Sequence, residues 1–158
     1  MGVLTTTYSV PPERMRKLRA HRGHLEKIFR AENEWAFARY DFEKTWEGKI
    51  RIIGKCYPST RDRLNHQTCW EHPGYDVWVV PPKDVQFAAK DIAGATFEGL
   101  LKWCNLLRRD GQREYVADAN GNAIPEELFS YYVGDLEDFK AFLRQAAGSG
   151  HSLLFATG

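Results

Sequence analysis

Apolar positions along the chain alternate between short β-branched runs, typical of strands, and repeats of three and four residues, typical of helices. Residues 2–8 are rich in β-branched and aromatic side chains and predict a first strand. Pro11-Pro12 then supplies the fixed φ that suits a first helical turn. We expect this helix to carry its apolar stripe to Phe29, with a break near Gly23.

A second helix is predicted to begin after Asp41, which would act as its N-cap, and to end at Gly54. Its apolar face would consist of four residues at helical spacing: Phe42, Trp46, Ile50 and Ile53. The residues 57–59 predict a turn, and 60–73 form a polar and aromatic stretch without a clean period. Because binding residues concentrate on loops, we expect this stretch to be the functional loop.

The next segments repeat the order of strand, proline and helix. Residues 75–80 predict a strand, Pro81-Pro82 opens a helix that reaches Ile92, and Thr96 caps the helix that follows. An Asn-Gly pair within 115–124 predicts a hairpin or tight loop.

The last third predicts a helix from Pro125 to Ala147, with a kink or restart at Gly134-Asp135, and then an apolar strand over 152–156. We therefore predict one domain over residues 1–158, of the α+β class. It would have a small mixed or antiparallel sheet, with its N- and C-terminal strands central or side by side, packed against several helices.

Composition narrows the functional classes. The chain has 158 residues, of which 43% are hydrophobic, and a formal net charge of +1, so no global field draws it to nucleic acid or an anionic membrane. The basic run 14–22 is expected to be a solvated helix face. Three cysteines and a start without a secretory pattern favour the cytoplasm, and no apolar run is long enough for a membrane span.

Four blocks, in order, carry a resemblance that extends along the chain: the start 1–4 leading through Pro11-Pro12, the Asp-Phe-Glu-Lys-Thr-Trp-Glu-Gly run 41–48, the segment 74–81, and 139–148 with the final strand. In these blocks the chain resembles the YfbM-like family of bacterial domains of unknown function. The resemblance implies a small, mixed α and β, cytoplasmic protein without an established activity, so it carries over no catalytic residue. The chain departs from the family at 66–72, where relatives are usually rich in glycine.

His66, Cys69 and His72 form an H-x2-C-x2-H pattern with the side chains that zinc prefers. The spacing is not an established zinc pattern, and we expect a polar loop rather than a metal site. A second possibility is a nucleophilic thiol, Cys69 or Cys56, with one of these histidines as its base.

Aromatic residues gather in the first half of the chain. Alternation over 75–79 places Tyr75 on one face of its strand and Trp78 on the other, so one face must be core and the other can be a partly exposed aromatic wall. We expect core packing to account for most of these aromatic residues, with Trp70 and Trp78 as the candidates for a recognition surface.

The preferred hypothesis is a non-enzymatic module that binds an unknown small molecule or protein through segment 57–78 and the region around Trp35 to Trp46. The candidate ligand-binding residues are Trp46, His66, Cys69, Trp70, His72, Tyr75 and Trp78. The alternative is a small enzyme with a Cys/His or metal-assisted site in segment 56–76. No catalytic set, cofactor or metal, and no nucleic-acid or membrane partner, is predicted, and the oligomeric state does not follow from the sequence.

Overall fold

The computed structural model describes residues 4–30, 38–65, 69–109 and 126–158. Its centre is a five-stranded sheet in the order β2-β1-β5-β4-β3, in which all neighbouring strands are antiparallel. The strands are β1 (Thr5–Val10), β2 (Ala38–Glu43), β3 (Cys69–Trp70), β4 (Asp76–Val80) and β5 (Ser152–Thr157). The α+β class and the pairing of the N- and C-terminal strands, β1 with β5, are confirmed.

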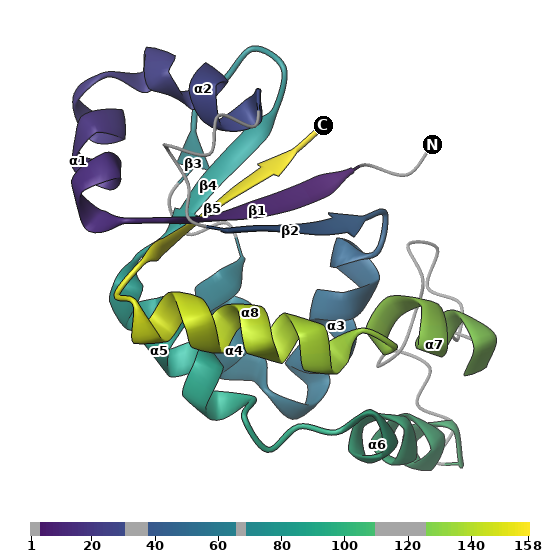
Figure 1. Cartoon of the computed structure of the whole chain (residues 1–158). Coiled ribbons are helices and arrows are strands. Elements are labelled where there is room, and N and C mark those ends of the chain that lie inside the picture. The colour runs from purple at the N-terminus through teal and green to yellow at the C-terminus, as the bar shows by residue number, and fades with distance from the viewer. Residues whose placement is uncertain (1–3, 31–37, 66–68, 110–125) are drawn as a thin grey trace.

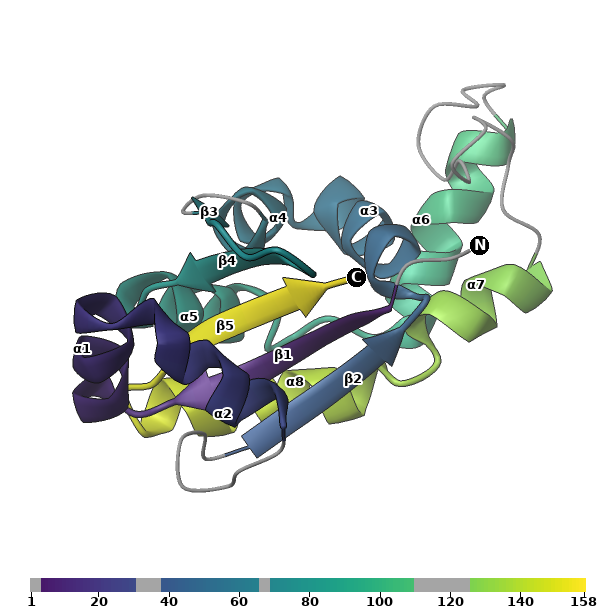
Figure 2. The ribbon, with the colours of Figure 1, turned by 90° about the horizontal axis from the view of Figure 1, so that it is seen from above.

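Helices cover both faces of the sheet (Figure 1). One face carries α1 (Pro12–Ala20), the 3-10 turn η1 (Arg22–His24) and α2 (Leu25–Phe29). The other face carries α3 (Trp46–Cys56), α4 (Pro58–Leu64), α5 (Pro82–Asp91) and α8 (Leu136–Gly148). Helices α6 (Phe97–Arg109) and α7 (Glu126–Val133) extend beyond the ends of the strands (Figure 2).

The proline-initiated helices form as predicted. Pro12 and Pro82 lie in the first turns of α1 and α5, where a missing N–H costs no hydrogen bond. The first helical stretch breaks at His21, before η1, close to the predicted position at Gly23. Thr96 caps α6 by accepting a hydrogen bond from the Gly99 N–H at 3.0 Å. The predicted interruption at Gly134-Asp135 separates α7 from α8.

The prediction that Asp41 caps a helix is wrong, because this residue lies inside β2. Its carboxylate accepts hydrogen bonds from Thr6 Oγ1 at 2.8 Å and from Arg39 Nε at 2.9 Å. Pairing with β1, more than thirty residues away, supplies the hydrogen bonds that hold this segment extended. Helix α3 begins only at Trp46, and it continues through Gly54 to Cys56.

The loop predicted over 60–73 is also shorter in the structure. Pro58 begins helix α4 instead of a turn, and the helix buries Thr60 and Leu64, one turn apart. The short strand β3 then pairs with β4. The predicted hairpin over 115–124, together with Trp35 and His66, lies outside the described residues.

Each face of the sheet has its own hydrophobic core. The α1–α2 side packs against Val77, Val79 and Leu154, whereas the α3–α8 side packs against Trp78 and Phe155. The expectation of a partly exposed aromatic face on β4 is therefore wrong, because helices bury both faces of this strand. Among the described residues, no helix combines the length and apolarity that crossing a membrane requires.

Candidate functional site

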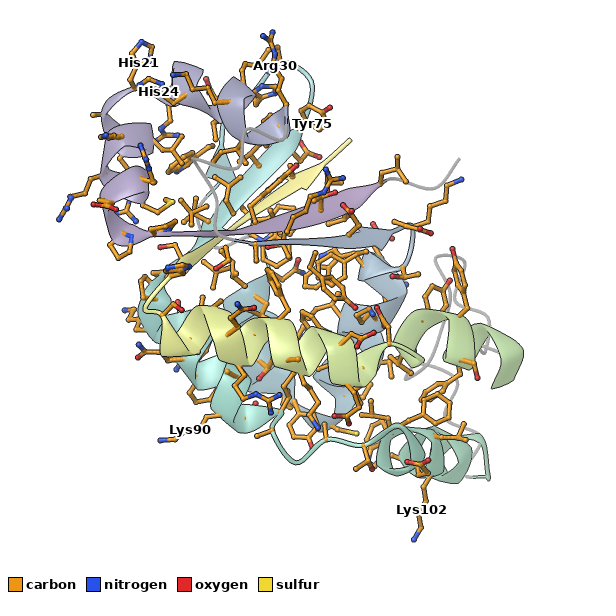
Figure 3. All side chains as sticks on the ribbon, in the orientation of Figure 1. His21, His24, Arg30, Tyr75, Lys90 and Lys102 are labelled. Atoms are coloured by element: carbon orange, nitrogen blue, oxygen red, sulfur yellow. The ribbon has the colours of Figure 1, made fainter. Side chains whose placement is uncertain are left out.

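The arm formed by α1, η1 and α2 faces the β3–β4 hairpin through a series of side-chain contacts. The Arg22 guanidinium lies 3.7 Å above the centre of the Trp70 ring system. Further along, the Glu26 carboxylate contacts His72, and the Phe29 ring packs against Tyr75 with their centres 5.0 Å apart. Figure 3 shows Tyr75 beside the end of α2, near Arg30. The arm and the hairpin together form one side of the molecule.

A pocket of about 260 Å³ opens at the first of these contacts. Its lining residues are Arg19, Arg22, Trp70, Val79 and Pro81. We call it the Trp70 pocket. Val79 belongs to the core beneath α1, and Pro81 directly follows β4, so the floor is apolar and held by the sheet. The arginines belong to α1 and η1 and are exposed to solvent. The pocket therefore combines a fixed apolar wall with a cationic rim.

The electrostatics of the rim favour an anion. The segment 12–29 contains six basic residues and two acidic ones. Within the part of the chain that the structure describes, neither Arg19 nor Arg22 forms an ion pair with a carboxylate. The indole of Trp70 is only 6% exposed, and a guanidinium over such a ring gains roughly 0.5–2 kcal/mol of cation–π attraction. Arg22 is thus held in place by Trp70, and no carboxylate of the described residues neutralises its charge.

His72 has both ring nitrogens engaged. Its Nδ1 accepts a hydrogen bond from the Gly74 N–H at 3.1 Å, so its Nε2 carries the proton and donates to Glu26 Oε1 at 2.8 Å. The ring also packs edge-on against Phe29, at 5.2 Å between centres. These contacts give His72 the role of joining α2 to the hairpin.

Cys69 and His72 do not form a catalytic pair. Cys69 lies opposite Trp78 in the β3–β4 ladder, so its side chain belongs to the α3–α8 side of the sheet, whereas His72 contacts α2. Burial raises the pKa of the Cys56 thiol, which is the reverse of what a nucleophile requires. Among the described residues, no group of three or more His, Cys, Asp or Glu side chains has a geometry that could hold a metal ion.

The remaining candidate residues fall into two groups, one buried in the core of the α3–α8 side and one on the α1–α2 side. Trp46 and Trp78 are 3% and 1% exposed and belong to the core of the α3–α8 side. The Trp78 ring stacks on Phe155, and its Nε1–H donates to the Leu64 carbonyl at 2.9 Å. Both tryptophans therefore have a packing role. Trp70, His72 and Tyr75 lie together on the α1–α2 side, and Tyr75 is 43% exposed.

Sequence reasoning missed Arg19 and Arg22. The basic run that contains them was expected to be a solvated face, because charged residues around an apolar stripe are common on surface helices. Their contribution to a pocket depends on Trp70, about fifty residues further along the chain, and local periodicity carries no information about that contact.

A second polar cluster lies on the α3–α8 side. The Lys49 ammonium, with a side chain only 1% exposed, forms an ion pair with Asp135, and the Tyr40 hydroxyl donates a hydrogen bond to the same carboxylate. Burial lowers the pKa of Lys49 against the opposing effect of Asp135. Burial and the bond to Asp135 raise the pKa of Tyr40 far above its usual value, so its hydroxyl remains a neutral donor. The cluster joins β2, α3 and the α7–α8 junction.

The fold and the pocket define a small α+β domain with an antiparallel sheet between two helical layers and a candidate ligand site on one of them. The chain belongs to the family DUF1877, a domain of unknown function, whose model matches residues 1–156. Together with the solved structure described next, this match confirms the resemblance to YfbM-like proteins.

Among solved structures, the chain is similar to the protein of unknown function YfbM from Escherichia coli. The two share 14% sequence identity and a TM-score of 0.62, over 98% of this chain and 99% of YfbM. At that identity the likeness shows the fold alone. No curated protein matches the chain.

Proposed function

We propose that this protein is a non-enzymatic binding module that takes a small molecule into the Trp70 pocket. The observation that carries the proposal is a nearly buried indole wall beneath a rim of arginines without carboxylate partners among the described residues. An apolar pocket with a few convergent polar groups is the usual form of a ligand site. Trp70 would supply the wall, Arg19 and Arg22 the polar contacts, and His72 and Tyr75 the support that keeps the hairpin against α2.

A small molecule fits this site better than a protein surface does. Recognition of a protein normally requires a wide patch with protruding apolar anchors. Here the apolar residues Val79 and Trp70 lie at the bottom of a concavity, and the most exposed aromatic of the hairpin, Tyr75, is occupied by contacts with Phe29 and His72. The affinity would therefore come from contacts with the residues that line the pocket.

The alternative of a small enzyme in segment 56–76 has less support from the described residues, to which His66 does not belong. The Cys69 thiol and the His72 imidazole lie on different sides of the sheet, and a base must come within hydrogen-bond reach of its nucleophile. The cytoplasmic location expected from the cysteines stays a prediction, which cell fractionation with an antibody to the protein would test.

The proposal is tested by screening the ¹⁵N-labelled protein by NMR against a library with equal numbers of anionic, neutral and cationic fragments. We expect hits whose chemical-shift changes centre on Arg22, Trp70 and Val79. Arg22→Ala should weaken them, whereas Tyr131→Ala, which removes an exposed aromatic ring from α7, should leave them unchanged. The proposal is wrong if the library gives no hits, or if the hits map consistently to another part of the molecule.

A further inference from the structure

We infer that the Trp70 pocket selects a small aromatic oxyanion, that is, a single flat ring bearing a carboxylate or a phosphate. This inference rests on the proposed function and specifies the ligand of the same site. It follows from three properties of the pocket: the charge of its rim, the way Arg22 is held, and its volume.

The charge of the rim requires an anion. Two arginines, Arg19 and Arg22, line the pocket, and no acidic residue of the described part of the chain lines it. Cations brought together at one cavity repel each other, and an oxyanion between them removes that repulsion while accepting charge-assisted hydrogen bonds. Carboxylate and phosphate both match the planar fork of a guanidinium, which presents parallel N–H donors.

The stacking of Arg22 on Trp70 favours a ligand that carries a flat ring next to its anionic group. The Arg22 guanidinium carbon lies 3.7 Å from the centre of the Trp70 ring, too close for an edge-on approach, so the guanidinium must stack on the indole. In a stacked arrangement the N–H donors at its edge point away from the ring. A ligand oxyanion can meet that edge without displacing the stack. The group attached to the oxyanion then lies against Val79, Pro81 and the rest of the indole, and a flat apolar ring fills this space.

The volume excludes larger cofactors. Pockets that enclose drug-sized ligands hold roughly 300–1,000 Å³. The Trp70 pocket holds about 260 Å³. It fits a single ring with its acid group but not a dinucleotide. A ligand with about ten non-hydrogen atoms in such a site is expected to bind with a Kd on the order of 1 mM or somewhat tighter.

Fluorine NMR of the full chain with three matched probes tests the inference. The probes are 4-fluorobenzoate, 4-fluorophenyl phosphate and the neutral 4-fluorobenzamide, with inorganic phosphate as a competitor. We expect both anions to broaden and shift on addition of protein, and the amide to bind at least about tenfold more weakly, because it cannot form the charge-assisted bonds. Inorganic phosphate should compete weakly, since it lacks the ring.

Variants on the arm assign the effect to the pocket. Arg19→Ala and Arg22→Ala should each weaken the anions about tenfold. Arg16→Ala, a change of the same charge at an exposed position of α1 that does not line the pocket, should leave the affinity unchanged. Arg22→Lys keeps the charge but loses the planar stack, so its affinity should lie between those of the wild type and Arg22→Ala.

The outcomes separate this inference from the proposed function. If the amide binds as well as the anions and shifts Trp70 and Val79, the pocket binds ligands but the anion specificity is wrong. If Arg16→Ala weakens binding as much as Arg22→Ala, the attraction is diffuse charge and the inference is overturned. If no probe perturbs the pocket while fragments of other chemistry do, the inference alone fails. If no compound of any class perturbs it, both fail.

Discussion

Lys49 is a charged residue whose ammonium is buried and therefore needs an ion-pair partner. Its ammonium is buried beside the rings of Tyr40, Phe42 and Phe139, at 5.7–5.9 Å from their centres, and its charge is balanced by Asp135. Burying a charge is unfavourable unless it is paired, so the stability of this region depends mainly on the Asp135 carboxylate at the α7–α8 junction, with a smaller contribution from Asp138.

Removing Asp135 should therefore cost more than removing Lys49. Breaking a buried ion pair costs about 3–5 kcal/mol, and because Asp135 is partly exposed we expect Asp135→Ala to lower the free energy of unfolding by about 2–3 kcal/mol. Lys49→Met should cost less than about 1 kcal/mol, since the remaining carboxylate can be hydrated. Urea denaturation measures both.

The double variant Lys49→Met/Asp135→Ala is the control for this prediction. It should be more stable than Asp135→Ala alone, because no unpaired buried ammonium is left. Equal stabilities of the two variants would show that the carboxylate acts through Tyr40 rather than through Lys49.

His151 gives a second prediction at the residue scale. It is 7% exposed, its Nδ1 is hydrogen-bonded to Ser9 Oγ at 2.8 Å, and burial lowers its pKa from the ordinary value of 6.5. Below about pH 6.5 the unfolded chain carries a proton on this ring that the folded chain does not. The free energy of unfolding therefore decreases as the pH is lowered, until the ring of folded His151 is protonated as well.

We expect the loss of stability between about pH 7.5 and pH 5 to be smaller in His151→Asn than in the wild type. Asn keeps a polar group near Ser9 but does not titrate. The measured quantity is the difference between the urea midpoints at the two pH values, so a general loss of stability in the variant does not affect it. Identical pH dependences would contradict this assignment.

At the scale of elements, the approach of α7 to α3 depends on Gly48. A Cβ at this position would overlap the ring of Tyr132 on α7. We expect Gly48→Ala to destabilise the protein by about 1–3 kcal/mol through overpacking, although alanine favours a helix more than glycine does. Thermal unfolding would measure the loss.

Two variants serve as controls for Gly48→Ala. At Gly94, between α5 and α6, an added Cβ would meet nothing within 4 Å, so Gly94→Ala should have little effect. In the Gly48→Ala background, Tyr132→Ala should recover part of the stability. If it does not, the helix contact is not the origin of the effect.

Elements with a local signal could be predicted from the sequence, and those that depend on distant pairing could not. Helices α1 and α5 begin at prolines that are visible in the sequence. The end of strand β2, Phe42 and Glu43, falls inside the predicted helix because Phe42 and Trp46 are four residues apart. Phe42 nevertheless belongs to the strand, and Trp46 to α3. Alternation of exposed Arg39 and Asp41 with apolar neighbours was the overlooked signal.

The candidate site shows the same limit. Trp70 and Tyr75 are predicted from the aromatic residues of the first half of the chain and His72 from the H-x2-C-x2-H pattern, and their role in binding stays a prediction. Residue type alone could not separate Trp70 from Trp78, since the face of each depends on the register of β3 with β4. Arg19 and Arg22, which complete the pocket, lie far before Trp70 in the sequence and come next to it only on folding.

At the scale of the whole molecule, the sheet is a partition with a separate core on each side. Strand β5 serves both cores, because Leu153 and Phe155 face one side while Leu154 and Ala156 face the other. It also lies between β1 and β4 and hydrogen-bonds to both. Without β5, the β2–β1 pair and the β4–β3 pair would not be joined into one sheet.

Removal of residues 152–158 should therefore abolish the fold rather than weaken it. We expect the truncated chain to lose the dispersed methyl resonances of a packed core in proton NMR. Deletion of Gly158 alone is the control. It removes the backbone hydrogen bonds with Leu4 and the contact with Tyr75 but leaves all of β5 in place, so the protein should stay folded. A truncated chain with native dispersion would contradict the central role of β5.

The position of β5 also affects how the protein folds while it is being synthesised. The ribosome makes this strand after the other four, so the edges of β1 and β4 that face β5 have no partner when they are made. The edge of β4 stays unpaired while residues 81–151 are added, and that of β1 for longer. Contacts that span nearly the whole chain form slowly, and exposed strand edges are sticky in the meantime. We expect nascent chains that stop before residue 152 to be bound by general chaperones and to be released once β5 is complete.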